Sequence, residues 1–179
     1  MLLFLCVLWY NKKGSEIMNR VDKINYYLDM AEVALERSTC LRRKWGAIIV
    51  KNDEIIATGY NGAPRGRKNC IDLNYCTREE MHIPRGERYE MCRSVHAEAN
   101  AIISASRKDC LDSTLYMVGV EASTGEYVPH ARPCAMCKRM IINAGIKSIV
   151  VRNTKQEYEI IETQEFIEND ETLDKVLGY

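Results

Sequence analysis

The spacing of apolar residues predicts a helix followed by a β-hairpin in the first third of the chain. Between residues 19 and 37 apolar side chains recur every three or four positions, which is the pattern of an amphipathic helix. Two runs rich in β-branched residues follow, Trp45–Val50 and Glu54–Tyr60, separated by the polar turn Lys51–Asp53. Two such runs joined by a short polar turn are typical of a hairpin.

The second half of the chain alternates helices and strands. Residues 94–107 return to helical spacing, and Thr114–Val120 is a continuous apolar run typical of a buried strand. A further helix is expected to begin at Pro133 and to end at Gly145, because proline suits the first turn and glycine the residue after the last. The strand Ser148–Arg152 then completes a strand–helix–strand unit, in which the two strands run parallel.

Three further segments surround this pattern. Residues 61–93 mix prolines, glycines and three cysteines without periodicity, so we expect an irregular, cysteine-rich loop insertion with a function or an anchor. The acidic C-terminal segment is expected to add a strand at Tyr158–Ile161 and a helix around Thr172–Leu177. Residues 1–17 are expected to be an extension of a single domain, 18–179. Their apolar run is too short to span a bilayer, and no basic region precedes it as in a secretory signal.

Composition and charge narrow the classes of function. The chain has 179 residues, 46% apolar and 28% charged, which is typical of a globular domain. Lys plus Arg and Asp plus Glu number 25 each, so no net charge attracts a polyanion, and we expect neither nucleic acid nor a membrane as partner. Eight cysteines leave two explanations, a disulfide framework or metal-binding and catalytic thiols.

Two short motifs decide between these explanations. His96-Ala97-Glu98 opens one predicted helix, and Pro133-Cys134-Ala135-Met136-Cys137 opens another. Zinc binds thiolate sulfur and imidazole nitrogen in tetrahedral geometry, and Cys-x-x-Cys lets two sulfurs on one helical turn reach one ion. The N-terminus of a helix also stabilises a thiolate. His96, Cys134 and Cys137 are therefore candidate zinc ligands.

The number of ligands points to catalysis. Three protein ligands are typical of a catalytic zinc site, in which the fourth position is left for water. Glu98 follows the histidine by two residues and could move protons as general acid and base. Taken singly, Cys-x-x-Cys is often a structural zinc knuckle or a redox pair, and a lone histidine is often a core residue. Together the motifs resemble the H-x-E…P-C-x-x-C signature of zinc nucleobase deaminases.

From about residue 18 to residue 152, the chain resembles the cytidine and deoxycytidylate deaminase superfamily, and within it the deoxycytidylate deaminases. The resemblance implies a three-layer α/β/α fold around a mixed sheet of about five strands. It also implies zinc-dependent hydrolysis of dCMP to dUMP and ammonia, which supplies dUMP for thymidylate synthesis. Four segments carry it: CLRRKWGA from Cys40, TGYNGAP from Thr58, CRSVHAEANAI from Cys92 and PCAMC from Pro133.

The same resemblance implies roles for further residues. Glu98 would pass a proton from water to ring N3, while the backbone at Ala97 and Cys134 would hold the pyrimidine edge. Asn61 would contact the sugar, although Asn-Gly is also a turn signal by itself. Arg42 and Arg43 are the candidates for the 5′-phosphate, since the arginine fork fits phosphate oxygens, but each could equally be a surface charge.

A second, structural zinc ion is a further expectation, because some members of the superfamily bind one beside the irregular segment. Cys40, Cys70 and Cys92 occupy positions similar to its ligands, and Cys76 or His82 could complete the site. The alternative is that these cysteines are free buried thiols.

Regulation and assembly follow from the resemblance alone. Many members are hexamers that dCTP activates and dTTP inhibits, so we expect a homo-oligomer, with Arg65 and Arg107 responding to the nucleotide triphosphate. The alternative is that both arginines are simply exposed.

Two other functions remain open at this point. One is a different deaminase of the superfamily, acting on cytidine, tRNA adenosine or a riboflavin precursor. The other is a zinc-stabilised binding module without turnover, although such a module has no use for Glu98 beside an open metal position. Reduced thiols used as ligands favour the cytoplasm.

Overall fold

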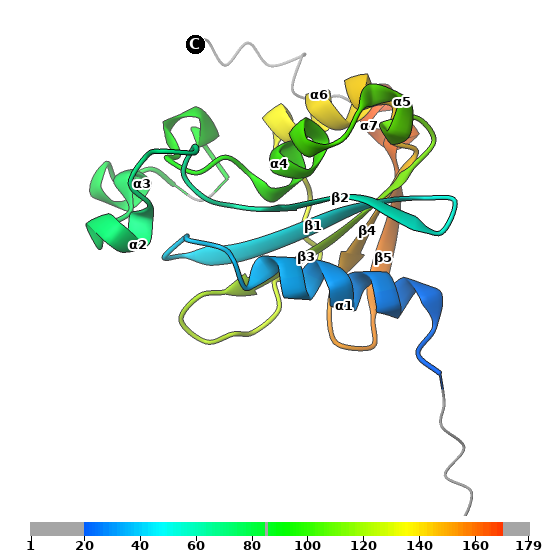
Figure 1. The fold of residues 1–179 in the computed structure, drawn as a ribbon. Coiled ribbons are helices and arrows are strands. Elements are labelled where there is room, and N and C mark those ends of the chain that lie inside the picture. Colours follow the sequence, from blue (N-terminus) through cyan, green and yellow to red (C-terminus); the bar gives the residue numbers. More distant parts are fainter. Residues whose placement is uncertain (1–19, 85, 170–179) are drawn as a thin grey trace, which may run out of the picture.

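A computed structural model describes residues 20–84 and 86–169, which form a five-stranded sheet covered by helices (Figure 1). The strands are β1 Arg43–Lys51, β2 Glu54–Tyr60, β3 Thr114–Glu121, β4 Ser148–Arg152 and β5 Tyr158–Glu162. The helices are α1 Lys23–Leu35, α2 Cys70–Leu73, α3 Thr77–Glu80, α4 Ala97–Ser104, α5 Arg107–Cys110, α6 Ala135–Ala144 and α7 Thr163–Glu168, with a short 3-10 helix, η1, at Tyr89–Met91.

The sheet is mixed, and its strands lie in the order β2-β1-β3-β4-β5. β1 runs antiparallel to both β2 and β3, which confirms the predicted hairpin. β3 and β4 run parallel and are connected through α6, which confirms the predicted crossover unit. β5 closes the other edge in antiparallel register with β4.

Helices cover both faces of the sheet, so the expected three-layer α/β/α fold is confirmed (Figure 1). On one face α1 packs through Leu28 in a core that also contains Ile48 of β1. On the other face α4 and α6 pack through Ala101 and Ile141 in a core with Ile49 of β1. Neighbouring residues of β1 thus point to opposite layers, as the pleat of a strand requires.

Two glycines allow helices on the two faces to approach the sheet closely. A Cβ atom on Gly46 would lie 2.0 Å from the carbonyl oxygen of Ala31 in α1. A Cβ atom on Gly59 would lie 2.2 Å from the carbonyl oxygen of Ala97 in α4. Both distances are far inside contact, so a side chain at either position would push its helix away. The first turn of α4 is therefore held directly against β2.

Some element boundaries differ from the prediction. The helix expected over residues 94–107 is divided into α4 and α5, because Ala105 between them is extended, with φ −103° and ψ 160°. The helix expected from Pro133 begins two residues later, with Cys134 as its N-cap. α7 was not predicted, since its short sequence carries little periodicity. The helix expected around Thr172–Leu177 and the extension 1–17 lie outside the described residues.

The insertion over residues 61–93 contains only short helical turns and projects beyond one end of the sheet, near α2 and α3 (Figure 1). No helix within the described ranges is both long enough and apolar enough to cross a membrane.

Candidate active site

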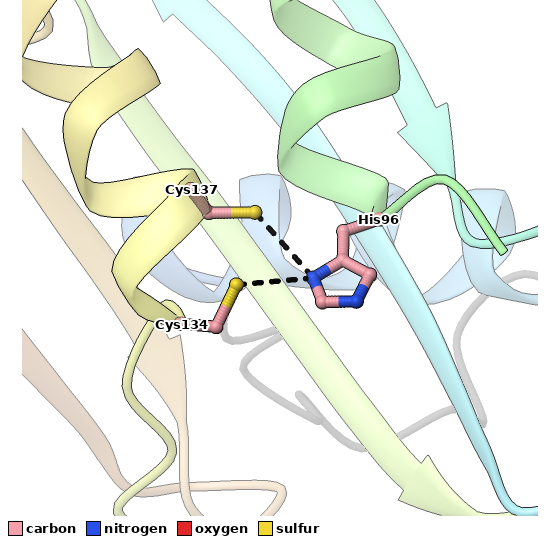
Figure 2. Close-up of side chains that lie close together, drawn as sticks. All are labelled: His96, Cys134 and Cys137. Atoms are coloured by element: carbon pink, nitrogen blue, oxygen red, sulfur yellow. Dashed lines mark hydrogen bonds between the residues drawn. The ribbon is translucent and has the colours of Figure 1, made fainter. Parts of the chain in front are cut away.

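The two helix starts that carry the candidate metal ligands lie side by side. His96 is the N-cap of α4, Cys134 is the N-cap of α6, and Cys137 follows on the first turn of α6. Figure 2 shows both sulfurs turned toward Nδ1 of His96, at 3.4 Å for Cys134 and 3.5 Å for Cys137. Within residues 20–84 and 86–169, no other group of three His, Cys, Asp or Glu residues brings all its ligand atoms within 4.8 Å of one another.

The donor set and its protonation fit a zinc ion. A hydrogen bond from Cys137 and the contact with His96 lower the pKa of Cys134 to about 4, although burial opposes this. Burial also disfavours protonated His96, but hydrogen bonds with Cys134 and Cys92 and the charge of Glu98 raise its pKa to about 11. Two sulfurs and one imidazole nitrogen at this spacing form a ligand set that suits zinc. A divalent ion binds such a set by replacing the exchangeable protons that the ligands hold.

Glu98 lies on the first turn of α4 with only 6% of its surface exposed. Burial raises the pKa of its carboxyl group, and this effect outweighs the opposite influence of protonated His96. The neighbouring Cys137 thiol acts in the opposite direction and lowers the pKa of this carboxyl group. A carboxylate whose pKa is raised is a stronger base, which is the property that a general base requires.

A cavity of about 450 Å³ opens onto this group of residues. Its wall combines His96, Cys134 and Glu98 with residues of β1, of the insertion and of the segment 127–132. A volume of this size suits a small organic ligand rather than a polymer. The side chains predicted to contact substrate can therefore be compared with the residues of its wall.

Asn61 lies in the cavity wall, but most of its amide is used within the protein. Its Oδ1 accepts hydrogen bonds from Ser38 Oγ at 2.6 Å and from the Trp45 backbone N–H at 2.8 Å. Its Nδ2 donates to the Arg43 carbonyl at 2.9 Å. One amide hydrogen is left without a protein acceptor among the described residues, and the side chain is only 5% exposed. Asn61 is thus rigidly held at the end of β2.

The two arginines predicted to bind phosphate also line the cavity, and each has a carboxylate partner. Arg42 Nε lies 3.0 Å from Glu79 of α3, and Arg43 Nη2 lies 2.7 Å from Glu121 of β3. Ala97 is fully buried on the first turn of α4, directly after His96.

The cysteines expected to bind a second zinc ion lie in one region. Burial raises the pKa of the Cys70 thiol, as do the charges of Cys40, Cys76 and Cys92, so the four are near neighbours. Their sulfurs are nevertheless spaced more widely than those of the first cluster, because no three of them lie mutually within 4.8 Å. His82 is exposed at a positive φ of 53°.

The two arginines expected to sense an effector lie apart from the main cavity. Arg65 is exposed in the loop after β2. Arg107 begins α5, donates from Nε to the Asn143 carbonyl at 3.2 Å, and lines a second cavity of about 370 Å³ whose wall does not include Arg65.

Sequence reasoning missed two side chains of the insertion that line the main cavity. The Tyr89 ring meets the His96 ring edge-on, with centroids 5.2 Å apart and an interplanar angle of 89°. Arg78 is buried and stacks over the Tyr89 ring, with its Cζ 4.5 Å from the ring centroid. Neither belongs to a motif, and the sequence signals only that the cysteine-rich insertion should lie near the site.

Comparison with known proteins identifies close relatives of this arrangement. The family model of the cytidine and deoxycytidylate deaminase zinc-binding region matches residues 21–153. A deoxycytidylate deaminase of Mycobacterium phage D29 is 36% identical over 138 residues, which is 74% of this chain and 96% of the phage protein. A deoxycytidylate deaminase of Schizosaccharomyces pombe is 31% identical over 147 residues, but this chain covers only 42% of its length.

One solved structure is similar to this chain in both fold and sequence. The dCMP deaminase of cyanophage S-TIM5, crystallised in complex with dCMP and dUMP, aligns with a TM-score of 0.51 and 28% identity, covering 75% of this chain and 85% of the phage chain. The family model spans the β1–β2 hairpin and both metal-ligand motifs, which border the cavity. The chain therefore belongs to the cytidine and deoxycytidylate deaminase zinc-binding family.

Proposed function

We propose that this protein is a zinc-dependent deaminase that converts dCMP and water to dUMP and ammonia. One observation carries the proposal: a buried carboxyl group, Glu98, lines a cavity of about 450 Å³ together with His96 and Cys134, two of the three converging metal ligands. The relatives named deoxycytidylate deaminase support dCMP as substrate.

In this reaction water adds to C4 of the cytosine ring and the amino group leaves from the same carbon. Zinc held by His96, Cys134 and Cys137 would lower the pKa of water and so make it a nucleophile at neutral pH. Glu98 takes the proton released from the water and transfers it to ring N3. It then assists the second proton transfer, to the leaving amino group, so that ammonia departs and dUMP forms.

The remaining contacts hold the nucleotide. The backbone at Ala97 and Cys134 lies at the two helix starts, where it can hydrogen-bond the edge of the pyrimidine. Asn61 directs its remaining amide hydrogen to the sugar, and its three internal hydrogen bonds fix its orientation. Arg42, directly before β1, and Arg43, its first residue, approach the phosphate, and each shares its charge with a carboxylate already beside it.

The cysteine-rich insertion is proposed to bind a second, structural zinc ion through Cys40, Cys70 and Cys92, completed by Cys76. Four thiolates that approach one another around zinc would anchor the long segment between β2 and α4. His82 is exposed and is the weaker fourth ligand. Zinc measured per chain should then be about two in the native protein and about one in a Cys70→Ser variant.

Assembly, regulation and location are proposed on the basis of the family. We propose a homo-hexamer whose activity dCTP raises and dTTP lowers, through Arg65 and Arg107. The seven cysteines of the described residues are all free thiols, which is consistent with a cytoplasmic protein that supplies dUMP for thymidylate synthesis. Rates that do not change with added dCTP and dTTP would contradict the regulatory part.

The direct test of this function is the conversion of dCMP to dUMP by purified protein, followed by the loss of cytosine absorbance and by separation of the products. Removal of metal with a chelator should abolish the conversion, and added zinc should restore it. A protein that retains zinc and its fold but produces no dUMP would contradict the proposal.

A further inference from the structure

Within the described residues the structure buries two arginines and surrounds them differently. Arg152 is fully buried and lies 2.8 Å from Asp29 and 2.6 Å from Glu32, so carboxylates balance its charge. Arg78 is 5% exposed, yet it forms no ion pair with any carboxylate in the part of the chain described. Since buried charges are normally paired, Arg78 is the anomaly.

Neutral groups alone hold Arg78 in place. Its Nη2 donates to the carbonyl of Pro84 at 2.9 Å and to the carbonyl of Glu87. Its guanidinium stacks on the Tyr89 ring, and its Nε has no hydrogen-bond partner. Carbonyl dipoles and an aromatic face orient a cation but do not cancel its charge. The arrangement therefore presents a fixed positive charge that lacks a counter-ion.

This charge belongs to the wall of the main cavity. Arg78, Tyr89 and His96 all line it, and the Tyr89 ring contacts both of the others, with its centroid 4.5 Å from Arg78 Cζ and 5.2 Å from the His96 ring centre. The guanidinium and a residue of the metal-ligand cluster thus contact the same aromatic ring. In a pyrimidine nucleotide a single sugar separates the base from the 5′-phosphate, so a base placed at Glu98 leaves its phosphate in the same cavity, whose wall includes Arg78.

The other arginines of the cavity wall already have carboxylate partners. Arg42 pairs with Glu79, and Arg43 pairs with Glu121. Arg132 Nη2 lies 2.6 Å from a Glu159 carboxylate oxygen. An anion that enters the cavity has to compete with these carboxylates, whereas no carboxylate among the described residues forms an ion pair with Arg78, although Glu90 is near enough for the charge of Arg78 to lower the pKa of its carboxyl group.

We propose that Arg78 binds the 5′-phosphate of the substrate and thereby selects nucleoside monophosphates over nucleosides. This inference rests on the proposed function, which places the pyrimidine beside Glu98. Because Nη2 already donates to two carbonyls and Nε is buried, Nη1 is the atom left to donate to the phosphate oxygens, and such charge-assisted bonds are strong. Arg78 acts on binding and takes no part in proton transfer.

The test compares binding of dUMP and deoxyuridine, which differ only in the phosphate, to the zinc-loaded full-length protein by calorimetry. Arg78→Gln should weaken dUMP binding about ten- to a hundredfold and leave deoxyuridine binding unchanged. Arg78→Lys, which keeps the charge but loses the fork, should weaken dUMP binding less. Arg88→Gln is the matched control, because Arg88 lies in the same insertion, is exposed and pairs with Glu90.

Three results would overturn the inference. The first is equal binding of dUMP and deoxyuridine by the native protein. The second is an unchanged preference for dUMP in Arg78→Gln. The third is an equal loss of affinity for both ligands together with a loss of zinc, which would show that Arg78 only supports the cysteine cluster. Failure of the proposed function is distinguishable. A native protein that binds dUMP through Arg78 but releases no ammonia from dCMP would contradict the deaminase assignment and leave Arg78 as a phosphate ligand.

Discussion

Replacement of Gly59 by alanine should show how far zinc affinity depends on the position of α4 rather than on the stability of the domain. The added Cβ atom would lie 2.2 Å from the Ala97 carbonyl oxygen and 2.5 Å from the Ala101 nitrogen. A relaxed carbon–oxygen contact is about 3.3 Å, so α4 and β2 must move apart by about 1 Å. His96 directly precedes α4, and metal sites tolerate ligand displacements of only about 0.2 Å.

The expected result is a loss of zinc affinity of about ten- to a hundredfold, comparable to the loss of a residue that orients a metal ligand. Overpacking should also lower the free energy of unfolding by about 1–3 kcal/mol. Gly46→Ala is the matched control, since its Cβ atom would lie 2.0 Å from the Ala31 carbonyl oxygen in α1, on the opposite face. It should cost similar stability but leave zinc affinity unchanged, because α1 carries no metal ligand.

Both variants can be measured by urea unfolding at saturating zinc and by competition for zinc with a chromophoric chelator. Equal zinc affinity in Gly59→Ala and Gly46→Ala, at comparable losses of stability, would refute the reasoning that the close packing of α4 on β2 positions the ligand.

Three other predictions follow from the site and the core. Glu98→Gln should lower turnover of dCMP by about 10²- to 10⁴-fold while zinc per chain stays constant, and full activity would exclude Glu98 as the acid and base. Partial burial raises the pKa of Asp29, but hydrogen bonds from Lys155 and Arg152 outweigh this and hold it below its usual range. The stabilisation is therefore present above the unfolded pKa of about 3.9 and is lost as the pH falls through the lower folded value, so Asp29→Asn should flatten the acid limb of stability measured by urea unfolding at several pH values. Arg152→Met leaves Asp29 facing Lys155 alone and should lower the unfolding free energy by about 2–4 kcal/mol, with no change in zinc content.

The elements with strong local patterns were predictable from the sequence. β1, β2, β3 and β4 are dense in β-branched and apolar residues, and the polar turn Lys51–Asp53 and the helix-end Gly145 separate the elements, so local pattern alone placed them. Boundaries at Ala105 and Pro133 were misplaced because extended backbone and cap geometry depend on tertiary packing. α7 escaped prediction because a helix of six residues has too few turns to show a period.

The chemistry of the site was predictable where it lies in local motifs and obscure where it depends on distant partners. The spacing of His96 and of the two cysteines of Cys-x-x-Cys identifies them as candidate metal ligands. The carboxylate beside Arg42 comes from Glu79, in the insertion, and no sequence pattern connects them. Likewise only the folded chain shows that Arg78 is buried against Tyr89 without a carboxylate.

The most direct test of the central claim is the rate of ammonia release from dCMP, deoxycytidine, CMP and cytidine by the purified protein, with zinc per chain measured in parallel. We predict bound zinc and a strong preference for dCMP, with the nucleosides turned over poorly because they lack the phosphate. Equal or greater rates with the nucleosides, or no release from any of the four despite bound zinc, would contradict the account.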